Sequence, residues 1–248
     1  MLKKILSITT IFLSLCLVTV DAATPKYSAD KAVLAYAELY AFGNSENIEA
    51  TGMPKETSDK VKENVDKYSM LPFYNYPLNK ENFAKVKTNL AEKIHEGIKI
   101  STRLKVDDPE NPVVEVTANH INQNKIDELK SNNANFVTLD IMKHISTPVE
   151  LATDGKFQNV ALSSLLGIIA ELPFTESTTL EVTCKLIEYE GNGYWMPQDL
   201  KALSGFVTPV FELKETDPEL IDSMLIQIFG SAAPTEESAK TEENSTEE

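Results

Sequence analysis

The segment that decides the fold is the alternating run Ile98-Lys99-Ile100-Ser101-Thr102-Arg103-Leu104-Lys105-Val106. Its even-numbered positions are apolar or threonine and its odd-numbered positions are all polar, which is the period of a strand with one buried face. Turn-forming residues with two prolines follow from Asp107 to Pro112, and a second alternating run extends from Val113 to Ile121. We therefore predict an antiparallel hairpin at the centre of the fold.

Helical patterns lie on both sides of this hairpin. Before it, apolar spacing and capping residues predict helices over 29–42, about 58–69 and 80–96. After it, a helical block covers about 122–172 and contains a capping-box pattern from Thr147 to Glu150. A second hairpin follows, in which the alternating run around Cys184 turns at Gly191-Asn192-Gly193 into Tyr194-Trp195-Met196. The sequence thus predicts an α+β fold, with N-terminal helices packed on a curved antiparallel sheet and a helical insertion between two hairpins.

The two ends of the chain differ from this central domain, which we assign to residues 23–230. Residues 1–22 have the pattern of a secretory signal peptide, with a basic start, an apolar run and small residues before a cleavage point after Ala22. A permanent membrane anchor is the less favoured alternative. Cys16 raises lipid attachment as another alternative, although Leu15 stands where a small residue normally precedes a lipidated cysteine. Residues 231–248 carry six Glu against one Lys and no aromatic residue, which predicts a disordered acidic tail.

The charge and composition exclude several classes of function. The 248 residues contain 23 Lys and Arg against 38 Asp and Glu, a formal net charge of -15, so we predict that no nucleic acid is bound. Beyond the signal peptide only Cys184 remains, which is expected to be buried and inert because it is in phase with apolar neighbours. The three histidines are too dispersed for a metal motif, and no phosphate loop or serine-hydrolase motif is present. We predict no metal and no cofactor.

Aromatic residues and one histidine are the candidate ligand contacts. Four rings lie between two predicted helices, where they could form an apolar rim with polar tips, or could instead fasten the helices to the sheet. His120 falls on the core-facing side near the end of its strand, and the single tryptophan follows the second turn. The candidate ligand-binding set is therefore Tyr68, Phe73, Tyr74, Tyr76, His120 and Trp195.

Several strings of the sequence resemble a family of exported bacterial proteins of unknown function, many of them lipoproteins. They are Ala35-Tyr36-Ala37-Glu38-Leu39-Tyr40-Ala41-Phe42-Gly43, Asn111-Pro112-Val113-Val114-Glu115-Val116-Thr117 and Thr179-Leu180-Glu181-Val182-Thr183-Cys184. The order of helices and hairpins, with Gly-Asn-Gly-Tyr-Trp in the second hairpin, also resembles a cystatin or NTF2-like fold. The resemblance implies a curved sheet around a long helix and a location in the cell envelope, and it assigns no catalytic residue.

Together these observations predict an exported, non-catalytic module that binds a small molecule, a peptide or an envelope protein, with no integral membrane span in the mature chain. One alternative is an enzyme of the same fold in which His120 or a carboxylate transfers a proton. Another is a surface protein without a pocket, in which the helical insertion of residues 122–172 forms a protein-binding face.

Overall fold

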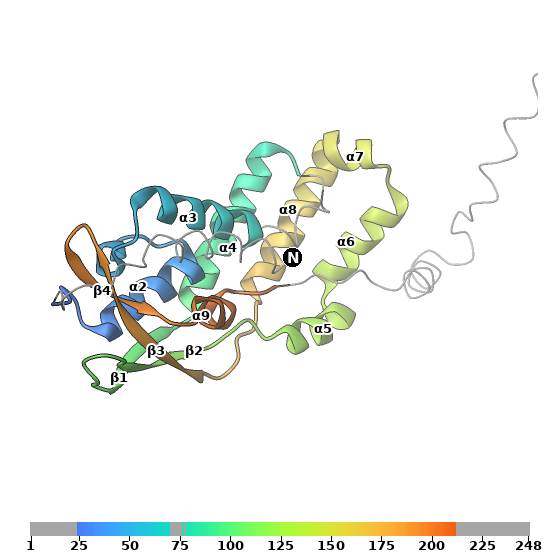
Figure 1. Cartoon of the computed structure of the whole chain (residues 1–248). Coiled ribbons are helices and arrows are strands. Elements are labelled where there is room, and N and C mark those ends of the chain that lie inside the picture. The colour runs from blue at the N-terminus through green and yellow to red at the C-terminus, as the bar shows by residue number, and fades with distance from the viewer. Residues whose placement is uncertain (1–23, 70–75, 77, 212–248) are drawn as a thin grey trace, which may run out of the picture.

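The computed structural model describes residues 24–69, 76 and 78–211 (Figure 1). The signal peptide and the acidic tail predicted from the sequence lie outside the described residues. The helices and strands, in chain order, are α2 (Ala29–Phe42), the 3-10 helix η1 (Ile48–Thr51), α3 (Lys55–Ser69), α4 (Lys80–Gly97), β1 (Ile100–Val106), β2 (Val113–Ala118), α5 (Gln123–Asn132), α6 (Ala134–Ile145), α7 (Pro148–Thr153), α8 (Gly155–Ala170), β3 (Thr178–Tyr189), β4 (Asn192–Pro197) and α9 (Leu200–Val207).

The four strands form one antiparallel sheet in the order β1-β2-β3-β4, which confirms the α+β class. The predicted central hairpin is present, with Ile100 opposite Ala118 and Leu104 opposite Val114. The second turn differs slightly from the prediction. It is formed by Glu190 and Gly191, which both have positive φ, because a two-residue hairpin turn that follows the twist of the strands needs such angles at both positions.

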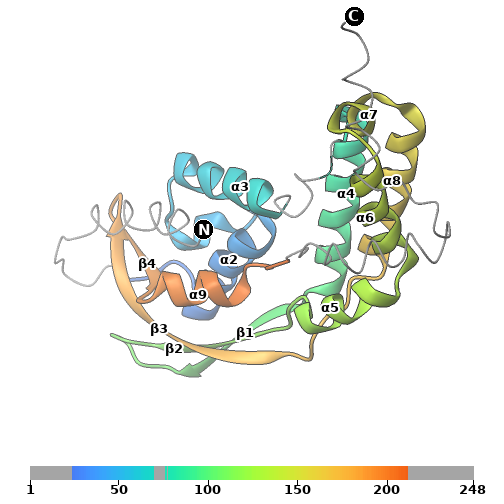
Figure 2. The same cartoon turned by 90° about the vertical axis from the view of Figure 1, so that its right-hand side faces the viewer.

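Helix α2 lies in the hollow of the curved sheet, as Figure 2 shows. The helix is apolar nearly all round because it packs on the sheet, on α3 and on α9 at once. Its predicted end is confirmed, since Gly43 adopts the left-handed conformation and its N–H bonds back to the last turn. Ser28 stands at the N-cap position but makes no side-chain hydrogen bond there. The resulting sheet core contains α2, the inner face of β2 and β3, β4 and α9.

A second hydrophobic core, the helical core, forms between α4, α6 and α8. Helix α4 buries Val86, Leu90 and Ile94, as its apolar stripe predicts, but this face packs on α8 and does not lie on the sheet. Of the three N-terminal helices, α2 contacts the sheet and α3 packs on α2. Within the described residues, none of the helices combines the length and the hydropathy required to cross a bilayer.

The chain passes back and forth between the two cores. Helices α2 and α3 belong to the sheet core, α4 belongs to the helical core, and β1 and β2 return to the sheet core. Helices α5 to α8, inserted between β2 and β3, extend the helical core before β3, β4 and α9 complete the sheet core. Phe42 and Ile100 pack against both cores and join them. Figure 2 shows the two lobes of the molecule that contain these cores. Each lobe is built from several separate segments of the chain.

Candidate functional site

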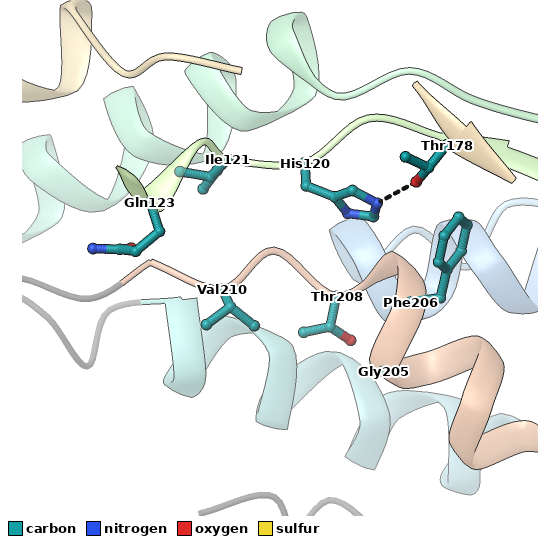
Figure 3. Close-up of a pocket in the computed structure, with 8 residues that line it drawn as sticks. All are labelled: His120, Ile121, Gln123, Thr178, Gly205, Phe206, Thr208 and Val210. Carbon is teal, nitrogen blue, oxygen red and sulfur yellow. Dashed lines mark hydrogen bonds between the residues drawn. The ribbon is translucent and has the colours of Figure 1, made fainter. Parts of the chain in front are cut away.

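A pocket of about 550 Å³ opens where the end of β2, the start of β3 and the end of α9 meet (Figure 3). The lining combines apolar surface with hydroxyl, amide and imidazole groups, and no carboxylate, ammonium or guanidinium group is among the described lining residues. These residues are His120, Ile121, Gln123, Thr178, Gly205, Phe206, Thr208 and Val210.

Backbone pairing places His120 next to the start of β3. Ala118, the last residue of β2, pairs with Thr178. Beyond the paired strands, the carbonyl oxygen of His120 accepts a hydrogen bond from the N–H of Thr175 at 2.8 Å, and the N–H of His120 donates to Thr175 Oγ1 at 3.0 Å. These bonds hold the segment after β2 against the chain before β3, so that the His120 side chain reaches Thr178.

Helix α9 supplies the opposite wall of the pocket. Asp199 caps this helix by accepting a hydrogen bond from the N–H of Ala202 at 2.8 Å, and Leu203 and Val207 are buried in the sheet core. Because these anchors occupy one side of a short helix, Gly205 and Phe206 remain on the pocket side.

The imidazole of His120 is held on two sides. Its Nε2 lies 3.2 Å from Thr178 Oγ1, and its ring meets the ring of Phe206 edge-on, with 5.1 Å between centroids. Burial lowers the pKa of His120 below its usual value of 6.5. At neutral pH the ring is therefore uncharged, and it offers one N–H donor and one bare nitrogen acceptor.

The structure does not bring the predicted ligand-binding residues together. Trp195 is 7% exposed and packs in the sheet core opposite Leu186. Tyr76 is 8% exposed and packs in the helical core, with the ammonium group of Lys143 lying 4.4 Å from the centre of its ring. Of the predicted residues, His120 is the one that lines the pocket among the described positions. Tyr68 lies in the last turn of α3, and Phe73 and Tyr74 lie outside the described residues.

Cys184 and the candidate metal ligands do not form a reactive site among the described residues. Cys184 is fully buried, and burial raises the pKa of its thiol to about 12, so the reactive thiolate does not form near neutral pH. Within residues 24–69, 76 and 78–211, no three His, Cys, Asp or Glu side chains are grouped so that they could hold a metal ion. His95 packs against Phe42, with 5.0 Å between the ring centres.

Sequence reasoning missed most of the pocket. Thr178, Gly205, Phe206 and Thr208 were not singled out. Helix α9, which carries Gly205 and Phe206, was not predicted. A pattern for that helix is present, since Asp199 precedes an apolar series at Leu200, Leu203 and Val207. The contact between this helix and His120, 86 positions away from Phe206, has no local pattern in the sequence.

A solved structure is weakly similar to this chain. No protein-family model matches the chain, and no curated protein is similar to it. A solved crystal structure of a candidate lipoprotein, YcdA from Bacillus subtilis subsp. subtilis str. 168, aligns over 73% of this chain with 17% identity and a TM-score of 0.40. The chain spans 56% of the length of that protein. The resemblance to cystatin or NTF2-like folds stays a prediction.

Proposed function

We propose that this protein is exported to the cell envelope and that the His120 pocket binds a small ligand without transforming it. Support for export comes from residues 1–22, whose basic start, apolar run and small residues before Ala23 form the pattern of a cleaved signal peptide. The observation that carries ligand binding is the pocket itself, in which apolar walls surround a few polar groups, as is typical of small-molecule sites.

The setting of His120 favours binding over proton-transfer catalysis. A general base works best when its pKa lies near the working pH and a positioned group stabilises its charged form. Here the desolvated ring has a lowered pKa, and its described partners are a hydroxyl group and a phenyl ring. Neither partner carries the negative charge that would offset an imidazolium ion. The site therefore suits recognition by hydrogen bonds and apolar contact.

A larger side chain at Gly205 should fill part of the pocket without straining the surrounding structure. A Cβ atom built at this exposed helical position meets no other heavy atom within 4 Å, so Gly205→Leu adds a side chain at the pocket wall without a backbone clash. Gly155→Leu is a matched control, because Gly155 begins α8, is also exposed and also has open space around its Cβ position.

The test is a thermal-shift screen of residues 23–248 against envelope metabolites, short peptides and small aromatic compounds. A compound at about 100 times its Kd stabilises the native state by about 2.7 kcal/mol, which raises Tm by several degrees. We expect such compounds to stabilise the wild type and the Gly155→Leu variant and to lose their effect on Gly205→Leu. A flat screen over a cooperative transition, or shifts that survive in Gly205→Leu, would contradict binding in this pocket.

Export is tested separately by expressing the full chain in a bacterium and measuring the intact mass of the product. Cleavage after Ala22 should yield a chain that begins at Ala23 in the envelope or secreted fraction. A cytoplasmic product that retains residues 1–22 would contradict export, and an added lipid mass at Cys16 would show anchoring instead.

A further inference from the structure

The two threonine hydroxyl groups that line the pocket each have a main-chain carbonyl oxygen within hydrogen-bond reach. Thr178 Oγ1 donates to the carbonyl oxygen of Ala118, and Thr208 Oγ1 donates to the carbonyl oxygen of Tyr40, each at 3.5 Å. A carbonyl oxygen can only accept, and a hydroxyl group has one hydrogen to give. Both threonines therefore retain only lone pairs for a further partner.

This arrangement favours one tautomer of His120. With the hydrogen of Thr178 directed at the carbonyl oxygen of Ala118, Thr178 Oγ1 accepts from His120 Nε2 at 3.2 Å. A neutral imidazole has one N–H, which places it on Nε2 and leaves Nδ1 as a bare acceptor. In Figure 3 the nitrogen that is not bonded to Thr178 lies on the side of the ring facing Thr208. No described residue hydrogen-bonds to it.

We propose that the pocket recognises an uncharged ligand through an N–H or O–H donor, which binds between His120 Nδ1 and Thr208 Oγ1, while the apolar part of the ligand packs on Phe206. This inference rests on the proposed function and adds the chemical class of the ligand. His120 and Thr208 both present lone pairs, so a ligand group that can only accept finds no partner at this point.

The lining also argues against a charged ligand. None of the eight described lining residues is Asp, Glu, Lys or Arg, so an ammonium or carboxylate group would lose its hydration without gaining a counter-charge. A carboxylate would in addition face the lone pairs of His120 and Thr208. Ile121, Phe206 and Val210 instead offer apolar surface to a ring or short chain.

Matched pairs of probes test this inference directly. Indole and 1-methylindole, and phenol and anisole, have similar apolar bodies, but the second member of each pair lacks the donor. We expect the donor member to bind the wild type about three to ten times more tightly, the range of a net hydrogen bond, in titrations followed by protein NMR. Thr208→Val removes one acceptor with little change of shape, and His120→Phe removes the other, so each variant should reduce this ratio.

A second measurement examines the acceptor without any ligand. Nitrogen-15 shifts of the imidazole at pH 7.5 should show a protonated Nε2 and an unprotonated Nδ1 for His120, assigned by comparison with His120→Phe. Thr178→Val removes the acceptor for Nε2–H and should bring the two tautomers closer to equal population. An Nδ1–H tautomer in the wild type would overturn the inference even if the pocket binds ligands.

The outcomes separate this inference from the proposed function. Equal affinity within each pair, with binding abolished by Gly205→Leu, would leave the pocket as a binding site and overturn the need for a donor. Tighter binding of anisole and 1-methylindole would overturn it as well. Absence of binding by all four probes, together with a flat compound screen, would overturn both proposals.

Discussion

Asn82 in α4 and Gln158 in α8 form a buried amide pair across the helical core, although 76 positions separate them in the chain. Asn82 Nδ2 donates to the main-chain oxygen of Gln158 at 3.2 Å. Gln158 Oε1 accepts from the N–H of Asn79 at 2.8 Å, and its Nε2 donates to the carbonyl oxygen of Leu151. One glutamine side chain thus connects the start of α4, helix α7 and helix α8.

Replacing this glutamine with an apolar residue of similar size should destabilise the protein. Gln158→Leu leaves the N–H of Asn79 and the carbonyl oxygen of Leu151 without their partner, at a cost of about 1–3 kcal/mol for each group that stays dry. Urea unfolding followed by circular dichroism measures the change. The control is Asn89→Ala, at an exposed position of α4, which should change stability by less than about 0.5 kcal/mol. Equal effects of the two substitutions would contradict a stabilising role for the amide pair.

Two of the left-handed glycines, Gly52 and Gly191, should respond differently to alanine. Both have positive φ, so either substitution forces a side chain into the left-handed region at a cost of about 1–2 kcal/mol. At Gly52 a new Cβ would also lie 2.5 Å from a ring carbon of Tyr194, whereas at Gly191 it meets nothing within 4 Å. Gly52→Ala should therefore lower the free energy of unfolding clearly more than Gly191→Ala. Equal losses in denaturant titrations would show that the Tyr194 ring moves aside freely.

His120 should make stability depend on pH in the mildly acidic range. Burial lowers its pKa in the folded protein below the 6.5 expected in the unfolded chain, so below pH 6.5 the unfolded chain binds more protons. The contribution of the neutral ring is present above pH 6.5 and is lost as the pH falls through the lower folded-state pKa. Proton NMR titration of the ring gives that pKa, and His120→Gln should flatten the fall in urea midpoint between pH 7 and pH 5. A folded-state pKa at or above 6.5 would contradict the desolvated setting.

Local patterns predicted much of the secondary structure. The alternation from Ile98 to Val106 predicts a strand, which the structure has as β1 from Ile100 to Val106. The capping box of Thr147 and Glu150 is formed with both of its hydrogen bonds. In these cases a residue's environment is set by neighbours within a few positions. The 3-10 helix η1 and helix α9 were missed because both are short, and short helices are fixed mainly by tertiary packing.

The candidate site was harder to predict because its parts come from distant positions. The strand period placed His120 on the inner side of the sheet, and it does line the pocket. The same reasoning could not tell that Trp195 and Tyr76 belong to two separate cores, because apolar rings serve interiors and binding sites with the same sequence pattern. What distinguishes these positions is the path of the chain between the cores, which no local period encodes.

That path has a consequence for the order of events in folding. The sheet core is incomplete until β3, β4 and α9 have been synthesised. These elements follow α4 to α8 in the chain. A chain emerging from the ribosome therefore cannot complete its sheet core until residues up to 207 have been made, and contacts between such distant segments form slowly. The sheet core of this polypeptide therefore stays incomplete through most of its synthesis, whereas the helical core can pack once α8 has been made.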